Sequence, residues 1–201
     1  MLNAVAARGF TLVELAIGLA ILAVLVTLAL PNFTIFLHNT QIKNAAETTL
    51  SGLTLARNEA VRRNTSVRFQ LMSDLTNGCA PSDTALNWVV STGDATGLCA
   101  TAPGVDPPGI IQAKAAAEGS RNVTVDAGGN AVLVFNALGR VTNVAGNVKI
   151  DLRNPTGGTC EHEDTTNGTM RCLRIEVSTG GAAKICDPKV GGSDTRACTL
   201  L

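Results

Sequence analysis

The feature that most constrains this chain is an apolar run near its start. From Leu15 to Leu30 the only polar side chain is Thr27. Counted from Phe10, the segment has 21 residues, which as a helix would be about 31 Å long, enough to cross a bilayer. Residues 10–30 are therefore predicted to form a transmembrane helix.

Two charged residues at the start of this segment need an explanation. Arg8 precedes the apolar run, and a positive charge there is predicted to keep the N-terminus in the cytoplasm. Glu14 lies inside the run, where a carboxylate is costly to bury without a partner. A free amine at Phe10 would lie one helical turn away on the same face, which requires cleavage after Gly9.

Two simpler interpretations of the segment compete with cleavage after Gly9. An ordinary secretory signal peptide is disfavoured, because the apolar run is long and no clear Ala-x-Ala site follows it. A plain transmembrane anchor fits the length, and only the pattern Gly-Phe-Thr-Leu-x-Glu argues against it.

The segment Gly9-Phe10-Thr11-Leu12-Val13-Glu14 resembles the signal of type IV prepilins and type II secretion pseudopilins. The resemblance implies that residues 1–9 are a leader, that a prepilin peptidase cuts between Gly9 and Phe10, and that the new amine of Phe10 is methylated. It also implies that Glu14 helps subunits to join a filament and that Pro31 kinks the helix.

The helical pattern continues through residues 31–64, which are predicted to form an amphipathic second half of the same helix. Its modestly apolar, Ala-rich stripe has spacings of three and four and consists of Ile42, Ala45, Ala46, Thr49, Leu50, Leu53, Ala56 and Ala60. Small side chains on this stripe would let a sheet pack closely. Arg62 and Arg63 suit the C-terminal end of a helix, so the helix is predicted to end at Asn64-Thr65.

Residues 65–201 are predicted to form a β domain. Val67–Leu71 alternates between apolar and polar side chains, as a half-buried strand does. Further strands are predicted at Leu86–Val90, Asn122–Val125, Ala131–Phe135, Val148–Leu152, Cys172–Val177 and Lys184–Cys186. Apart from Leu86–Val90, residues 73–120 are predicted to be loop.

All six cysteines lie beyond residue 78. An even number of cysteines behind a membrane helix favours disulfides in an oxidising compartment. Among the 15 or so connectivities that six cysteines allow, sequence order favours Cys79–Cys99, Cys160–Cys172 and Cys186–Cys198. No Cys-x-x-Cys pair is present, which disfavours a zinc site.

Three C-terminal segments are similar to the GspH/FimT branch of the same family: Phe135–Gly139, Val148–Leu152 and Arg174–Gly181. With the N-terminal motif they cover most of the chain but leave residues 73–120 unmatched. The resemblance implies an α+β, pilin-like fold, in which a long N-terminal transmembrane helix packs on a C-terminal antiparallel β-sheet domain.

For function, the resemblance implies a structural minor pilin or pseudopilin. Such a subunit is held in the inner membrane by a single span, with its C-terminal domain in the periplasm. It then assembles with other pilins into a type IV pilus or a type II secretion pseudopilus, and one sequence does not separate these two filaments.

Neither an enzyme site nor a cofactor is predicted. The chain has two histidines, of which His38 lies just past the membrane helix and His162 lies in an acidic run, Glu161–Asp164. That run could hold a metal, but a solvated loop inside a disulfide is the favoured interpretation. The sequence contains no nucleophile elbow, P-loop or dinucleotide fingerprint.

A pilus-associated DNA receptor is the alternative function. Some FimT-like minor pilins resemble DNA receptors with a Gly-Arg-x-Arg segment, but the matching positions here are Gly181-Ala182-Ala183-Lys184. Lysine offers a point charge in place of the bidentate fork of arginine, and the formal net charge of the chain is zero. Weak DNA contact would have to come from five cations near the C-terminus: Arg171, Arg174, Lys184, Lys189 and Arg196.

Overall fold

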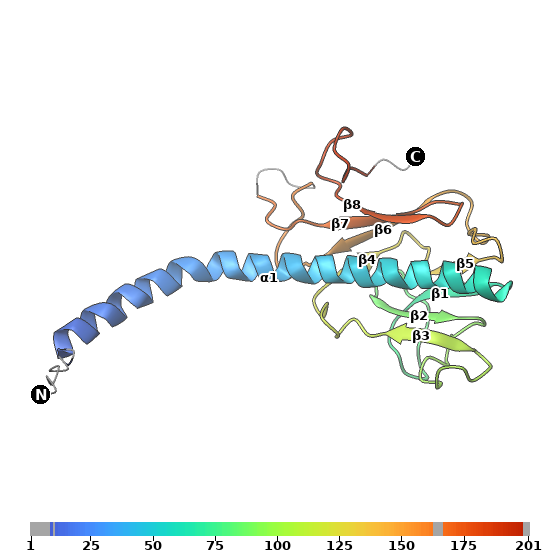
Figure 1. The fold of residues 1–201 in the computed structure, drawn as a ribbon, viewed down its shortest axis with the longest axis horizontal. Coiled ribbons are helices and arrows are strands. Elements are labelled where there is room, and N and C mark those ends of the chain that lie inside the picture. Colours follow the sequence, from blue (N-terminus) through green and yellow to red (C-terminus); the bar gives the residue numbers. More distant parts are fainter. Residues whose placement is uncertain (1–8, 10, 163–166, 199–201) are drawn as a thin grey trace, which may run out of the picture.

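One long helix organises the molecule (Figure 1). The computed structural model describes residues 9, 11–162 and 167–198, apart from the side chains of residues 28–32. Helix α1 spans Leu12–Arg63 and has 52 residues. The predicted helix is thus confirmed from Leu12 to its C-terminal end, whereas Phe10 lies outside the described residues.

Both ends of α1 have the caps that their sequences favour. Thr11 Oγ1 accepts a hydrogen bond from the backbone N–H of Glu14 (3.2 Å), and Glu14 Oε2 accepts one from the backbone N–H of Thr11 (2.9 Å). This reciprocal pair is a capping box, whose sequence signature is Thr-x-x-Glu. At the other end Asn64 adopts a left-handed conformation with φ of 50°, which Asn tolerates better than most residues, so the predicted end of the helix is confirmed.

In the described part of the chain, eight strands form two antiparallel sheets of four strands each. Their orders are β3-β2-β1-β5 and β4-β6-β7-β8. Both sheets lie along the C-terminal half of α1 (Figure 1). The strands are β1 (Val67–Met72), β2 (Asn87–Ser91), β3 (Ile110–Lys114), β4 (Thr124–Asp126), β5 (Val132–Phe135), β6 (Val148–Arg153), β7 (Leu173–Val177) and β8 (Ala183–Cys186).

Strand β3 is the element that the sequence pattern missed. It lies within residues 73–120, which were predicted to be loop apart from one strand, so that prediction was wrong. Only two apolar residues, Ile110 and Ile111, precede Gln112, and most of the strand is not buried. Because β3 pairs with β2 alone and lies at a sheet edge, it shows little of the alternation that marks a half-buried strand.

The Ala-rich stripe of α1 faces the sheets. Its members Ile42, Ala45, Ala46, Thr49, Leu53, Ala56 and Ala60 are all at most 1% exposed. Leu50 is the exception, because it is half-buried and lines a shallow depression on the outer side of the helix. The stripe therefore buries one face of this half of the helix and leaves the opposite face to solvent.

Gly52 lets α1 approach the first sheet closely. A Cβ at this position would lie 2.9 Å from Phe69 Cε2 and 3.1 Å from Trp88 Cζ2. The two rings pack against each other with their centroids 5.8 Å apart. Real Cβ atoms essentially never approach another atom to 2.9 Å, so a larger residue at position 52 would force the two rings or the helix to shift.

Three disulfides link the cysteines in the order that the sequence favours. The bonds are Cys79–Cys99, Cys160–Cys172 and Cys186–Cys198. Cys79–Cys99 belongs to a small second core with Met72, Val89, Ala95 and Ile110. This core therefore anchors part of the region between β1 and β3, whose sequence lacks strong periodicity. Disulfides that close loops of this size typically stabilise a domain by about 3 kcal/mol.

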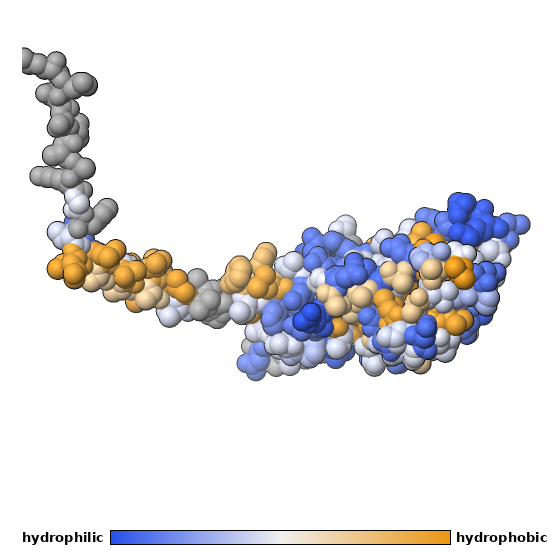
Figure 2. Space-filling view, turned by 90° about the horizontal axis from the view of Figure 1, so that it is seen from below, coloured by the Kyte–Doolittle hydropathy of each residue, from blue (hydrophilic) through white to orange (hydrophobic). Residues whose placement is uncertain are grey.

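The N-terminal half of α1 extends away from the sheets (Figure 1). Large apolar side chains are exposed all along it, in the orange part of the helix in Figure 2: Leu12, Val13, Leu15, Ile17, Leu19, Ile21, Leu22, Val24, Leu25 and Val26. Across the residues that the structure describes, no helix meets the combined length and hydropathy requirement for a membrane span.

Candidate functional site

The N-terminal motif is the first candidate site. Gly9 is exposed, and Phe10, the predicted site of methylation, lies outside the described residues. Glu14 Oε2 accepts hydrogen bonds from both the backbone N–H (2.9 Å) and the hydroxyl (2.8 Å) of Thr11. Within one chain, therefore, the Glu14 carboxylate already has partners in Thr11, and the sequence pattern Thr-x-x-Glu indicates them.

The helix is continuous through the predicted kink site. Pro31 lies inside α1, and the axis of α1 curves between its extended half and the half that carries the sheets (Figure 1). Proline removes one backbone hydrogen bond from a helix and crowds the preceding turn, so it is an ordinary cause of bending. The specific role of Pro31 stays a prediction.

The second candidate site, the set of five C-terminal cations, is neutralised by carboxylates. Arg174 donates two hydrogen bonds to Asp151, from Nε at 2.7 Å and from a terminal nitrogen at 3.0 Å. This cross-strand contact joins β6 and β7, and the hydrogen bond to Asp151 raises the pKa of Arg174. Lys184 lies 3.7 Å from Glu176, whose carboxylate is buried.

The other three cations of this set are paired in the same way. Arg171 Nε lies 2.7 Å from Asp187, which is buried, and Lys189 contacts Glu161. Arg196 binds Asp194 at 2.7 Å, and hydrogen bonds from Arg196 lower the pKa of Asp194 to about 2. Phosphate neutralisation by cations dominates affinity for nucleic acid, and each of these five cations already has a carboxylate beside it. The structure therefore does not support the DNA hypothesis, and DNA contact by these residues stays an untested prediction.

A cavity of about 490 Å³ opens between α1 and strands β7 and β8. Its apolar lining includes Phe36, Leu173 and Ile185, and Arg171 and Arg196 lie on its wall. Because both arginines are already paired with carboxylates, the cavity offers no concentrated charge for an anionic ligand.

Within the described residues, neither histidine belongs to a group of metal-ligand side chains. His38 Nδ1 is buried without a hydrogen-bond partner, and it faces Gly157 beside Met170 Sδ, both atoms lying within 2.7 Å of the position of a Cβ on Gly157. His38 therefore packs between α1 and the loop that precedes β7. His162 lies next to Glu161, which pairs with Lys189, and the two acidic residues that follow lie outside the described residues.

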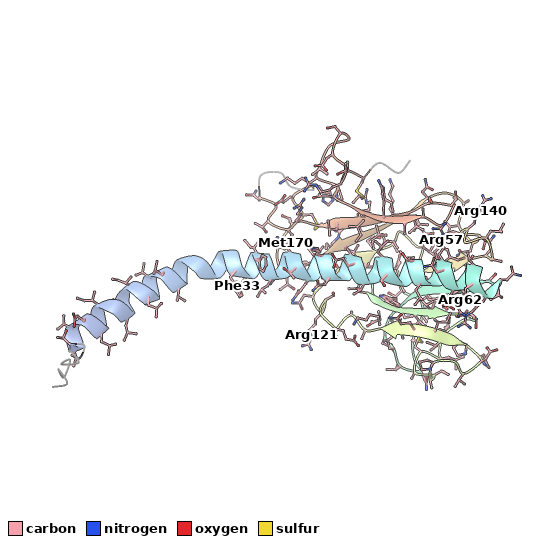
Figure 3. The ribbon with its side chains drawn as sticks, in the orientation of Figure 1. Phe33, Arg57, Arg62, Arg121, Arg140 and Met170 are labelled. Atoms are coloured by element: carbon pink, nitrogen blue, oxygen red, sulfur yellow. A yellow bond between two sulfur atoms is a disulfide. The ribbon has the colours of Figure 1, made fainter. Side chains whose placement is uncertain are left out.

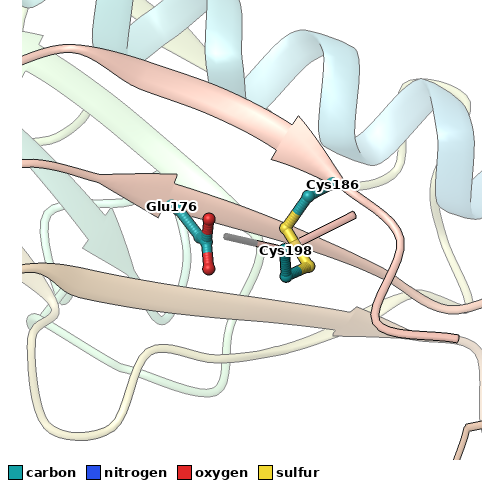
Figure 4. Close-up of side chains that lie close together, drawn as sticks. All are labelled: Glu176, Cys186 and Cys198. Carbon is teal, nitrogen blue, oxygen red and sulfur yellow. A yellow bond between two sulfur atoms is a disulfide. The ribbon is translucent and has the colours of Figure 1, made fainter. Parts of the chain in front are cut away.

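One group of metal-ligand types does come together in the described part of the chain. Glu176, Cys186 and Cys198 place their donor atoms within 4.8 Å of one another (Figure 4). The two sulfurs are joined in a disulfide, and metals are bound by free thiolates. The Glu176 carboxylate in turn lies near the ammonium group of Lys184, so the group is explained as a buried ion pair beside a disulfide.

Two family models match this chain, one at its N-terminal motif and one over the β domain. The model of the family "Type II transport protein GspH" matches residues 45–181, and that of the "Prokaryotic N-terminal methylation motif" matches residues 6–30. The first match includes residues 73–120, so the expectation that this region falls outside the resemblance was wrong. No curated protein matches the chain.

Solved structures are similar in fold. Two crystal structures of the type IV minor pilin FimU from Pseudomonas aeruginosa align with this chain. One has a TM-score of 0.52 and 16% identity, and covers 79% of this chain and 98% of that chain. The other has a TM-score of 0.48 and 15% identity, and covers 76% and 98%. The alignment with the TM-score of 0.52 shows that the two chains share a pilin-like fold, and an identity of 16% shows the fold alone.

Proposed function

Because this chain belongs to the GspH family of type II transport proteins, we propose that it is a structural minor pilin or pseudopilin that assembles with other pilins into a filament. The filament is a type IV pilus or a type II secretion pseudopilus. The match to the methylation motif and the fold shared with a type IV minor pilin support this proposal. It involves neither catalysis nor a cofactor.

The single observation that carries the proposal is the contrast along α1. One half is covered by the two sheets, while the other exposes large apolar side chains from Leu12 to Val26. Apolar surface costs about 25 cal/mol per Å² when it faces water, so this half needs a cover that the other described residues do not supply. Lipid would cover it in the inner membrane, and helices of neighbouring subunits would cover it in a filament.

Processing prepares this helix for assembly. We expect prepilin peptidase to cut between Gly9 and Phe10 and the new amine of Phe10 to be methylated, since the methylation-motif match spans residues 6–30. The leader with Arg8 then stays on the cytoplasmic side, and the disulfide-bonded domain lies in the periplasm, where an oxidising environment maintains such bonds.

Glu14 acts in assembly in this proposal. After cleavage its carboxylate has two sets of possible partners: Thr11 in its own chain, and the amine of Phe10 in a neighbouring chain. An unpaired charge in lipid is unfavourable, and pairing with an opposite charge offsets much of that cost. Docking against a second processed chain is thereby favoured over isolated storage.

Intact-mass measurement of the chain extracted from inner membranes tests the processing step. The expected mass is that of residues 10–201 with three disulfides and one added methyl group. Sheared-filament fractions from the same cells should contain this mature form together with other pilins. A chain that still begins at Met1, or that is cut near Ala29, would overturn the proposal, as would its absence from every filament fraction.

A further inference from the structure

A cluster at the C-terminal end of α1 has features that the filament role does not yet explain. We call it the distal patch, and it consists of Arg57, Val61, Leu138 and Arg140. Figure 3 shows Arg57 and Arg140 at the same end of the molecule, opposite the extended half of α1. The patch joins two segments that are distant in sequence, the last turns of α1 and the turn that follows β5.

The turn that carries Leu138 is held rigidly. Asn136 Oδ1 accepts hydrogen bonds from the backbone N–H groups of Leu138 and Arg140, each at 3.0 Å. The backbone adds hydrogen bonds from Gly139 N to Asn136 O (2.8 Å) and from Asn136 N to Arg140 O (2.9 Å). A binding element that is already ordered loses less conformational entropy when a partner docks.

The same turn is wedged between α1 and the β7–β8 turn. A Cβ at Gly139 would lie 3.1 Å from Arg57 Nε and 3.2 Å from Val61 Cγ2. On the other side, a Cβ at Gly181 would lie 1.8 Å from the carbonyl oxygen of Gly139. Glycine at both positions, each with positive φ, therefore lets three segments meet closely and fixes how Leu138 is presented.

Leu138 is unusually exposed for an apolar residue of the folded domain. Its side chain is 77% exposed and that of Val61 is 52% exposed, compared with 50% for Val105 and 37% for Leu98. A single exposed apolar residue needs no explanation. Here, however, the exposed leucine lies on a rigid turn that also carries Arg140 and packs against Arg57, and arginine is enriched at protein interfaces.

At this end of the molecule, positive side chains outnumber negative ones. Arg57 and Arg140 form no ion pair with a carboxylate in the described part of the chain, in contrast to the five C-terminal cations. Arg62 and Arg63 share one carboxylate, that of Glu59, each at 2.6 Å. The last turns of α1 and the turn after β5 thus bring four arginines and one glutamate to this end of the molecule, in a chain whose formal net charge is zero.

We propose that the distal patch binds an acidic surface on a neighbouring filament subunit, with Leu138 in an apolar pocket and Arg57 and Arg140 paired with carboxylates. Charge complementarity favours an acidic partner, because a surface rich in arginines repels a basic one. A protein fits better than a nucleic acid, since the centre of the patch is an aliphatic side chain and no aromatic ring is present for bases to stack on. The identity of the partner as a filament subunit rests on the proposed function.

Site-specific photo-crosslinking in cells that make the full chain tests this proposal. Benzoylphenylalanine replaces Leu138, and as a control it replaces Val105, which is exposed elsewhere. The expected result is an adduct from position 138 to another filament subunit, mapped by mass spectrometry to a carboxylate-rich segment. Arg57→Glu with Arg140→Glu should reduce this adduct at least fivefold.

A matched control separates specific pairing from general charge. Arg121 and Lys149 are exposed and also form no ion pair in the described part of the chain, so Arg121→Glu with Lys149→Glu makes the same charge change away from the patch. This variant should leave the adduct at its native level. Equal loss in both double variants, or no loss in either, would overturn the proposal, and so would an adduct to nucleic acid.

Filament recovery without irradiation distinguishes failure of the distal patch proposal from failure of the proposed filament role. If the chain is recovered in sheared filaments but position 138 gives no adduct, the distal patch proposal fails and the filament role stands. If the chain is absent from filaments, the proposed function fails and the assignment of the partner fails with it.

Discussion

The two halves of α1 form one continuous helix but differ in how their apolar side chains are covered. In the N-terminal half, apolar side chains surround the helix and are exposed. In the C-terminal half most of them lie on one stripe that the sheets cover, with Val61 as an exposed exception near the end of the helix. A stripe indicates a helix that packs on its own domain, whereas an all-round apolar surface indicates a helix that is covered by lipid or by other chains.

This difference implies that equivalent substitutions should have unequal effects in the two halves. In the C-terminal half they should change the stability of the domain, and in the N-terminal half they should change insertion or assembly alone. Trp88 offers a convenient readout, because it is the only tryptophan and its side chain is buried beside Phe69 and Gly52. Its fluorescence should report unfolding of the purified full chain in detergent.

The largest effect is expected from Leu53→Ala. Leu53 is 1% exposed in the main core, so its truncation should leave a cavity and lower the free energy of unfolding by about 3 kcal/mol. Leu22→Ala removes the same atoms from a side chain that is 56% exposed and should leave domain unfolding unchanged. A similar loss in both variants would show that the two halves are not energetically separate.

A smaller effect is expected from Gly52→Val. The new side chain would collide with Phe69 and Trp88, and overpacking of this kind should cost about 2 kcal/mol in the free energy of unfolding. Gly18 is the matched control, since a Cβ there would meet no atom within 4 Å. Gly18→Val should leave the unfolding midpoint at its native value, and a native midpoint for Gly52→Val would contradict the close approach of α1 to the sheet.

A still smaller effect is expected from the ion pairs at the end of the C-terminal half. Hydrogen bonds from Arg62 and then Arg63 lower the pKa of Glu59 from 4.5 to about 2. A carboxyl group whose pKa is lowered by folding adds stability that is present above pH 4.5 and is lost as the pH falls toward 2. The melting temperature of the native chain should therefore exceed that of Glu59→Gln at pH 5, and the difference should shrink as the pH falls to 2.

A gap between the two melting temperatures that stays constant from pH 5 to pH 2 would contradict this assignment. Glu47→Gln is a useful control, because Glu47 lies on the same helix and contacts Lys43 at a longer distance of 3.7 Å. Its melting temperature should follow that of the native chain more closely across the same range.

Local sequence patterns predicted the helix and most strands because each of these elements carries its own periodicity. Strand β3 could not be found this way, since at a sheet edge it is defined by its pairing with β2 and not by its own burial. The capping box at Thr11 and Glu14 has a four-residue sequence signature, so these partners of Glu14 were predictable from the sequence, although only a charged partner was predicted.

Interactions between distant residues account for the rest of what sequence reasoning missed. The five C-terminal cations were predicted to form a cluster near the C-terminus. Arg196 pairs with the nearby Asp194, but the partners of Arg171, Arg174 and Lys189 are 16 to 28 residues away in the chain. Arg174 meets Asp151 only because β6 and β7 pair in one particular register. In the same way, Arg57 and Arg140 approach one turn from positions far apart in the chain, so no local motif could reveal the distal patch.

The smallest effect on the fold, and the sharpest test of the comparison, is expected from Glu14→Val. Glu14 lies in the half of α1 that makes no contact with the sheets, so the domain should keep its native unfolding midpoint and its three disulfides. The chain should still be cut after Gly9. Its recovery in sheared filaments should fall strongly, because the carboxylate that favours docking over storage in lipid is gone.

The measurement for Glu14→Val is a comparison of sheared filaments and membrane fractions by immunoblot, with Glu14→Asp as the conservative control. Because Asp is one methylene shorter, it should restore part of the recovery if the role of Glu14 is electrostatic. Thr11→Val removes the hydroxyl partner within the same chain but leaves the carboxylate free for a neighbouring amine. If Thr11→Val abolishes recovery as fully as Glu14→Val, the capping box itself is what assembly requires. Native recovery for Glu14→Val would instead show that the exposed apolar half of α1 suffices for assembly without its charge.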